Sequence, residues 1–485
     1  MIQGLKPYPA YNDSGVPWLG EVPEHWGLRN LGSMASPVSQ RGRPDLPLLS
    51  VVREKGVIPR ATMSDDENHN FVPEDLSNYK VVREGNLVIN KMKAWQGSLG
   101  IAPYDGVVSP AYFVFDFRIG DRSYGQALLR SKPYVALFAR ASDGVRIGQW
   151  DLSISGMKRI PVVVPPVAEQ SAIVRFLDHA DRIIRRYVRA KRRLVGLLNE
   201  QKQAIIHQAV TRGLDPNVRL KPSGIDWVGD VPEHWGVAPL KRIKALAPNS
   251  FVDGPFGSNL KSEHYVEGGD VYVVESGFVT SGQFVWKKFK TITREHFQTI
   301  NRSSCEGGDI VIAKIGARYG MAAILPELDK PAVVSGNSLK LTINETRYDR
   351  RYIHLSLLCA RFRGAFFHFA NATAQPALSL RGLNNLSLPT PGIDEQRGIV
   401  QAVGEQTREV DLALHQTACE ITLLREYRTR LIADVVTGKL DVRGVELPQS
   451  EEAEELPRVG DEIADNATEE GGELEPVEEV THAAG

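Results

Sequence analysis

The segment WLGEVPEHWG (residues 18–27) recurs 209 positions later as WVGDVPEHWG (residues 227–236). Two further pairs match in the same order. They are EGNLVINKMKAWQG (84–97) with GGDIVIAKIGARYG (307–320), and PPVAEQSAIV (165–174) with PGIDEQRGIV (391–400). From about residue 107 the offset between matching positions stays at 226. An internal repeat of this kind dictates architecture, so the sequence predicts two copies of one unit, the second longer by 17 residues.

Each copy is predicted to begin with a globular part of mixed α and β structure. The runs LVIN (87–90) and IVIA (310–313) follow glycine turns and are continuously apolar, which is typical of strands buried on both faces. Residues 123–142 and 348–371 have helical patterns.

Each globular part is followed by a segment that predicts a long helix. Within 166–212, apolar residues recur in alternating steps of four and three for nearly five heptads, which is typical of a coiled-coil seam. A helix of this length spans about 65 Å. The matching segment 392–437 has a less regular stripe. The predicted seam residues are Leu177, Ile184, Leu194, Leu198, Ile205, Val403, Val410, Leu424 and Leu431.

The two predicted helices differ in charge. Residues 166–212 have ten Lys/Arg and four Asp/Glu, whereas residues 391–437 have five and eight. Opposite net charge favours pairing of the two helices with each other over self-pairing. We expect an antiparallel pair with a globular domain at each end. The simpler alternative is that the arginines between residues 182 and 193 form a solvated helix face.

The fold class expected from these patterns is α+β: two mixed α/β domains separated by two long helices in an antiparallel coiled coil, with the pseudo-twofold symmetry of a tandem repeat. The predicted boundaries are an entrance segment 1–27, a first globular domain 28–164, a first long helix 165–212, a linker with the repeated motif 213–236, a second globular domain 237–390, a second long helix and its end 391–445, and a tail 446–485.

Composition limits the possible classes of protein. The 485 residues are 42% hydrophobic and 24% charged, as in soluble globular proteins. No apolar run is long enough to cross a bilayer, and the first fifteen residues lack the apolar core of a secretory signal, so a cytoplasmic location is expected. The three cysteines are too far apart for a CxxC site. The tail has 14 acidic residues and one basic residue, which indicates disorder and leaves a moderately basic body.

A twofold-related protein can place equivalent surfaces on two half-sites of a DNA duplex. In this context the chain resembles the specificity subunit of type I restriction-modification systems, over residues 8–445. The resemblance rests on the order of domains and helices, on the two VPEHW motifs, on the Pro-x-x-x-Glu-Gln pattern at Pro165–Gln170 and Pro391–Gln396, and on GPFGSNLK (254–261). In the second helix start, Gly392 replaces the inner Pro166, while the leading proline is retained.

The resemblance implies that the globular domains are target-recognition domains, each reading one half of a bipartite double-stranded DNA site. It implies assembly with two adenine-N6 DNA methyltransferase subunits and with translocating nuclease (restriction) subunits, and no membrane partner. S-adenosylmethionine, ATP and Mg²⁺ would be bound by those partners, and none by this chain.

Base readout needs side chains that match base edges, such as Arg or Lys for guanine and Asn or Gln for adenine. Basic and aromatic residues follow the buried strand of each copy, and further polar residues precede each long helix or lie in GPFGSNLK. The candidate DNA contacts in the first copy are Lys91, Lys93, Trp95, Gln96, Ser98, Arg146 and Gln149. Those in the second copy are Ser258, Asn259, Lys261, Lys314, Arg318, Tyr319, Gln375 and Arg381. The alternative for each loop is a structural turn with surface lysines.

No catalytic or metal site is predicted. The sequence has no GxxxxGK[ST] phosphate loop, no Asn-Pro-Pro-aromatic motif and no HExxH. An enzyme with its own nuclease or methyltransferase chemistry is therefore disfavoured. A coiled-coil interaction scaffold that does not read DNA remains the alternative function, and steep loss of DNA affinity with salt would separate the two.

Overall fold

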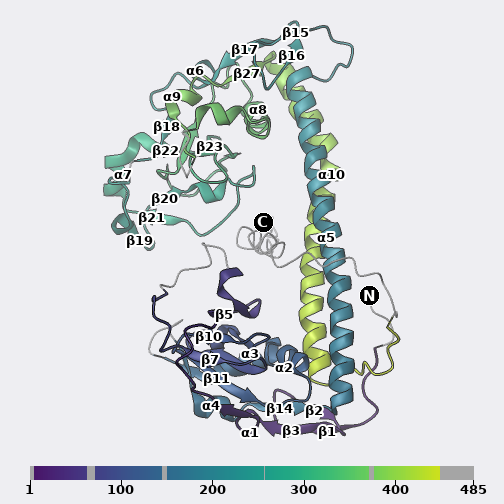
Figure 1. The fold of residues 1–485 in the computed structure, drawn as a ribbon. Helices are drawn as coiled ribbons and strands as arrows, with labels where there is room; N and C mark the ends of the chain where they lie inside the picture. Colours follow the sequence, from purple (N-terminus) through teal and green to yellow (C-terminus); the bar gives the residue numbers. More distant parts are fainter. Residues whose placement is uncertain (1–4, 63–71, 145–149, 256, 371–375, 448–485) are drawn as a thin grey trace, which may run out of the picture. The chain divides into compact units, whose positions relative to one another are not determined.

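The computed structural model, shown in Figure 1, describes residues 5–62, 72–144, 150–255, 257–370 and 376–447. The chain divides into two compact units. The first unit comprises Met1–Ala190 and Ile421–Gly485, and the second comprises Lys191–Glu420. Each long helix therefore contributes to both units. The predicted acidic tail, apart from its first two residues, lies outside the described residues.

The first globular part is built on a four-stranded antiparallel sheet with the strand order β4-β11-β8-β9 (Figure 1). All five residues of the predicted buried strand, β8, are buried, which explains its continuous apolar sequence. Its main elements are β4 (Ala35–Pro37), β8 (Asn86–Asn90), β9 (Leu99–Ile101), β11 (Tyr112–Phe117), α2 (Arg122–Leu129) and α3 (Lys132–Arg140).

The second globular part contains a sheet of the same connectivity, with the order β18-β26-β23-β24. Its central strand β23 is the second predicted buried strand, and all four of its residues are buried. The main elements are β18 (Phe251–Asp253), β23 (Ile310–Ala313), β24 (Ala322–Ile324), β26 (Ser338–Leu341) and α8 (Arg350–Phe362).

A second sheet distinguishes the two globular parts. The second part has five strands in the order β19-β21-β20-β25-β22, whereas the described residues of the first part form the two-stranded ladders β5-β6 and β10-β7. The bounds are β5 (Leu49–Val52), β6 (Gly56–Pro59), β7 (Lys80–Val82), β10 (Gly106–Val108), β19 (Tyr265–Val266), β20 (Val271–Val274), β21 (Lys290–Ile292), β22 (Ser304–Cys305) and β25 (Ala332–Val334).

Short elements connect these sheets. They are β1 (Tyr11–Asp13), β2 (Glu21–Pro23), α1 (Leu31–Met34), η1 (Arg60–Thr62), η3 (Ala94–Gln96), β12 (Ser142–Asp143), β13 (Asp151–Leu152), α4 (Ile154–Lys158), β15 (Leu220–Pro222), β16 (Asp230–Pro232), α6 (Leu240–Ile243), η4 (Ser262–His264), η5 (Ser276–Phe278), α7 (Arg294–Ile300), η6 (Asn301–Ser303), η7 (Ala365–Phe369) and α9 (Leu380–Leu383).

In both units, the strand after the repeated VPEHW motif pairs with the strand before the long helix. In the first unit β3 (Gly27–Asn30) pairs antiparallel with β14 (Pro161–Val164). In the second unit β17 (Gly236–Pro239) pairs antiparallel with β27 (Ser387–Thr390). The two most distinctive sequence motifs of each copy are thereby brought together.

The glutamate of each Pro-x-x-x-Glu-Gln pattern accepts hydrogen bonds from the VPEHW motif. In the first unit, Trp26 Nε1 donates to Glu169 (3.0 Å), Tyr8 Oη donates to the same carboxylate (2.6 Å), and His25 Nε2 lies 2.7 Å from it. In the second unit, Trp235 Nε1 and His234 Nε2 each lie 3.0 Å from Glu395. These bonds satisfy buried polar groups and fix each helix start on its own domain.

The neighbouring glutamine connects the helix start to a second helix. Gln170 Nε2 donates to Pro165 O, and Gln170 Oε1 accepts from Asp121 N, both at 2.8 Å. Asp121 is the N-cap residue of α2. The second unit repeats both 2.8 Å bonds with Gln396, Pro391 and Asp349, and Asp349 caps α8.

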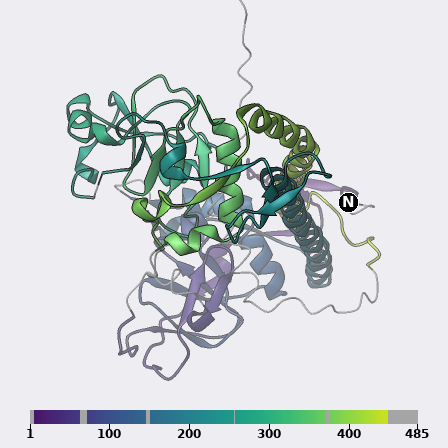
Figure 2. The same ribbon diagram turned by 90° about the horizontal axis from the view of Figure 1, so that it is seen from above.

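The long helices are α5 (Val167–Arg212, 46 residues) and α10 (Ile393–Val436, 44 residues), drawn in Figure 1 and Figure 2. In the second unit, Lys191 pairs with Glu420 and Lys202 with Asp411, so residue numbers rise along one helix as they fall along the other. In the first unit, Asp181 pairs with Arg428. Such pairs set orientation and register more than stability. Within the described residues, no helix has the length and apolar character needed to cross a bilayer.

The inward residues of α10 follow the predicted heptads. Val403, Val410 and Leu431 are buried, and Leu424 is half-buried between them. Buried Thr407 and Thr417 lie in the same stripe. An apolar spacing of 3.5 residues therefore describes this helix from end to end.

The stripe of α5 departs from the prediction beyond Ile184. Leu177 and Ile184 are buried and Leu198 and Ile205 are half-buried, but Leu194 is 39% exposed, which contradicts its assignment to the seam. The inward positions recur every 11 residues, at Ile173, Ile184, Val195 and Ile206. An 11-residue repeat corresponds to 3.67 residues per turn, so a 3.5-residue pattern drifts off the inward face.

The second unit contains a histidine that makes its stability pH-dependent. His354 Nε2 donates to Ala322 O (2.9 Å), and burial lowers the pKa of His354. The unfolded chain then binds a proton more readily, so the free energy of unfolding of this unit should fall below pH 6.5, by up to about 1.4 kcal/mol per pH unit. At the corresponding place in α2 the first unit has Gln126, whose Oε1 accepts from Ile101 N (2.7 Å).

Hydrogen exchange of the α8 amides at pH 7, 6 and 5 measures this effect. His354→Gln should flatten the pH dependence in α8 and leave α2 unchanged. Buried His207, whose pKa is also lowered, accounts for a smaller remaining slope. An unaltered slope in the variant would contradict the assignment.

Candidate nucleic-acid interface

In the first unit, the turn that follows β8 contacts the segment that precedes α4. Leu152 N donates to Lys91 O (2.9 Å), and Lys91 Nζ forms an ion pair with Asp151 (3.0 Å). The rings of Trp95 and Trp150 make an edge contact at 5.2 Å. The two loops predicted to contact DNA in this copy therefore lie together, with cationic and aromatic groups at their junction.

The individual candidates in this turn differ in exposure. Lys93 is exposed, whereas Lys91, Trp95 and Gln96 are half-buried. Ser98 is only 2% exposed, so the prediction of a direct DNA contact is wrong for this residue. The chain re-enters the sheet as β9 immediately after Ser98, which turns that side chain into the core. Arg146 and Gln149 lie outside the described residues.

In the second unit, a cavity of about 630 Å³ brings together three loops that were each predicted to contact DNA. Gly254, Pro255, Gly257 and Leu260 come from the GPFGSNLK loop. Lys314 comes from the turn after β23, and Ala377–Leu380 precede α9. Ser258, Asn259 and Lys261 of the first loop and Arg381 beside the third are exposed. Sequence reasoning found these loops separately, and the fold joins them.

Charge at this cavity is concentrated around one carboxylate. Asp253 Oδ2 accepts from Lys314 Nζ (3.0 Å), and Asp253 Oδ1 accepts from Arg302 (3.2 Å). Asp253 is 15% exposed and Arg302 is 58% exposed. One carboxylate neutralises only one of two cations, so the cluster has a net positive charge that suits a phosphate group. Asp253 and Arg302 were not predicted, although Asp253 directly precedes the GPFG motif.

Two candidates in the second turn have different environments. Arg318 is exposed, but Tyr319 is only 5% exposed and packs under the guanidinium of Arg361 at 4.8 Å. The prediction that Tyr319 faces DNA is therefore wrong, because the aromatic ring belongs to the core cluster of this unit. Gln375 lies outside the described residues.

The two turns are equivalent in backbone geometry. Leu152 N donates to Lys91 O in the first unit, and Leu378 N donates to Lys314 O in the second, both at 2.9 Å. Each copy thus holds the lysine after its buried strand against the loop that precedes a short helix. The side-chain partners differ: Lys91 pairs with Asp151, whereas Lys314 pairs with Asp253. A common frame with different polar groups is what two readers of different half-sites require.

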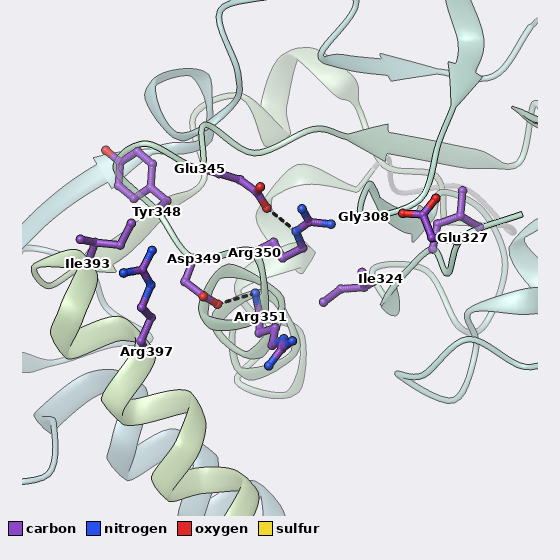
Figure 3. Close-up of a pocket in the computed structure, with 11 residues that line it drawn as sticks. Gly308, Ile324, Glu327, Glu345, Tyr348, Asp349, Arg350, Arg351, Ile393 and Arg397 are labelled. Carbon is purple, nitrogen blue, oxygen red and sulfur yellow. Dashed lines mark hydrogen bonds and ion pairs between the residues drawn. The ribbon is translucent and has the colours of Figure 1, made fainter. Parts of the chain in front are cut away.

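Another cavity in the second unit, of about 730 Å³, lies near the start of α10 (Figure 3). Three arginines and three carboxylates line it, and Arg350 pairs with Glu345. The φ of Gly308 is 91°, and an added Cβ there would overlap the Arg350 guanidinium. None of the predicted DNA contacts lines this cavity. We assign it to the junction of domain and helix, and within the described residues no acidic, His and Cys side chains are grouped to hold a metal ion.

The fold defines the class of protein that this chain resembles. A chain from a solved structure described as "Structural basis underlying complex assembly and conformational transition of the type I R-M system" is 14% identical, with a TM-score of 0.55. The match covers 86% of this chain and 98% of that chain. The two share a fold of mixed helices and strands, as predicted.

Sequence comparison names the relatives within that class. The chain is 23% identical over 292 residues to the type I restriction enzyme MjaVIII specificity subunit of Methanocaldococcus jannaschii. That match spans 59% of this chain and 64% of the relative, less than two thirds of its length. The putative type I restriction enzyme MjaX specificity subunit of the same organism is 18% identical over 88% of this chain and 96% of its own length. No protein-family model matches the chain. The predicted resemblance to type I specificity subunits is confirmed.

Proposed function

We propose that this chain is the non-catalytic DNA-specificity subunit of a type I restriction-modification complex. Each globular part reads one half of an asymmetric, bipartite DNA site, and the two sites of contact are the Lys91 and Lys314 turns with their neighbouring loops. The observation that supports this most directly is the convergence of three independently predicted loops on one cavity of the second unit.

The long helices are proposed to act as a coiled-coil spacer that fixes the gap between the half-sites and docks the methyltransferase subunits. The cross-helix ion pairs and the matched heptads of α10 support this role. The identical sheet connectivity of the two units supports a tandem repeat with approximate twofold symmetry. S-adenosylmethionine, ATP and Mg²⁺ would be bound by the methyltransferase and restriction subunits.

Expression of the chain with its methyltransferase subunits, followed by genome-wide mapping of N6-methyladenine, tests the proposal. The expected result is one asymmetric motif with a fixed central gap. The purified complex should also lose affinity for a duplex with that motif by about 10³–10⁵-fold between 50 and 200 mM salt, if six to ten phosphates are neutralised. Absence of any motif, together with salt-insensitive association, would favour the interaction scaffold instead.

A further inference from the structure

We infer that the segment Gln283–Lys290 forms an additional DNA-contacting surface in the second unit, with Trp286 stacking against a base step and the adjacent lysines on phosphates. The inference rests on the proposed function and extends it to residues outside the three loops described above. We call this segment the aromatic-basic loop.

An exposed tryptophan stands on a rigid aromatic base in this loop. Trp286 is 63% exposed, and its ring makes edge contacts with Phe284 (5.3 Å) and Phe289 (6.3 Å). Phe289 in turn stacks on Phe278 (4.7 Å) and Tyr272 (4.4 Å). Packing alone would bury such a large ring, whereas a ring held from beneath and open above can stack on a base.

Three lysines follow or flank this ring. Lys287, Lys288 and Lys290 are exposed, and the side chain of Lys288 is 89% exposed. The acidic partner of Lys288 is Glu267, which is itself 93% exposed and 3.6 Å away, so the pair is weak and easily exchanged for a phosphate. Basic residues interleaved with aromatic ones are the composition of surfaces that bind nucleic acid.

The aromatic-basic loop is continuous with the candidate cavity. Lys290 Nζ donates to Glu275 (2.8 Å) and lies over the ring of Tyr265 at 5.1 Å. Glu275 and Tyr265 both line the cavity. The hydrogen bond to Glu275 raises the pKa of Lys290, so this lysine stays charged where the two surfaces meet. A duplex bound at the cavity would therefore have a cationic path to Trp286.

The contact should belong to one half-site only. The first copy has no tryptophan between residues 27 and 94, the stretch that corresponds to this region. Apolar side chains that enter a base step unstack it and kink the duplex, which is favoured at flexible pyrimidine–purine steps. Trp286 would thus add a preference at positions in the second half-site that no polar side chain reads.

The test uses the full chain in complex with its methyltransferase subunits and a duplex containing the mapped motif. Trp286→Ala should weaken binding about 10- to 100-fold, and Trp286→Phe should weaken it less. Leu246→Ala is the matched control, because Leu246 is 96% exposed in the same unit, and it should change affinity less than twofold. Replacing both Lys287 and Lys288 by alanine should lower the slope of log K against log salt by about 1.8. A 2-aminopurine base in the second half-site should brighten on binding of the wild type and not of Trp286→Ala.

The outcomes separate this inference from the proposed function. If the wild type binds the motif and both the tryptophan and the lysine variants bind as tightly, the inference is overturned and the proposed function stands. If Trp286→Ala loses the methyltransferase subunits but keeps its DNA affinity, the loop docks a protein and the inference is overturned. If the wild type binds no duplex, both fail. Because the lysines are exposed, their variant reports on DNA even if Trp286→Ala is unstable.

Discussion

Replacing Gly254 by valine will lower the affinity of the complex for its bipartite duplex to the non-specific level, a loss of about 10³-fold or more. A Cβ at this position would lie 1.9 Å from Ser335 O and 2.2 Å from Ser335 C. These are backbone atoms, so no change of rotamer relieves the overlap. The loop that holds Ser258, Asn259 and Lys261 must move away from the cavity.

Gly257→Ala provides the matched control, because a Cβ there meets no atom within 4 Å. It lies in the same loop and should bind within about threefold of the wild type. Gel shifts with duplexes altered in either half measure both variants, and the map of N6-methyladenine should show a degenerate second half or no motif for Gly254→Val. Wild-type affinity for Gly254→Val, with the fold intact by hydrogen exchange, would remove this loop from the reading surface.

The parts of the fold that follow from local pattern could be predicted from sequence. The strands β8 and β23 are short apolar runs after glycine turns, and burial on both faces requires that composition. The long helices were visible because they lack interior prolines and keep an apolar stripe over many turns. The stripe of α5 was predicted in the wrong register beyond Ile184 because 3.5 and 3.67 residues per turn diverge only after several turns.

The candidate site was predictable to the level of loops and not of side chains. Ser98 and Tyr319 stand next to exposed lysine and arginine in the sequence, yet each turns into the core where the chain re-enters its sheet. Asp253 and Arg302 are separated by 49 residues, so no local pattern links them. Trp286 lies in a region with no matching motif in the first copy, and a search guided by the repeat therefore passes over it.

Replacing Glu169 by alanine should lower the free energy of unfolding of the first unit by about 3–5 kcal/mol. Glu169 is 5% exposed and accepts from Tyr8 Oη and Trp26 Nε1, with His25 Nε2 as its third neighbour. Its removal leaves two buried donors without an acceptor, and each costs about 1–3 kcal/mol. Burial and the Glu169 carboxylate raise the pKa of Tyr8, so its hydroxyl keeps its proton and cannot accept a bond in exchange.

Glu395→Ala in the second unit is the natural comparison, because Glu395 occupies the same place but is 33% exposed, with no tyrosine among its partners. Water can reach the donors it leaves, so the loss there should be about 1–2 kcal/mol. Hydrogen exchange at the starts of α5 and α10 measures the two units separately within one chain. Equal losses would mean that the repeated motif contributes the same stability regardless of burial. Unequal losses in the predicted order would locate the stronger domain–helix junction in the first unit, where Tyr8 supplements the shared tryptophan and histidine.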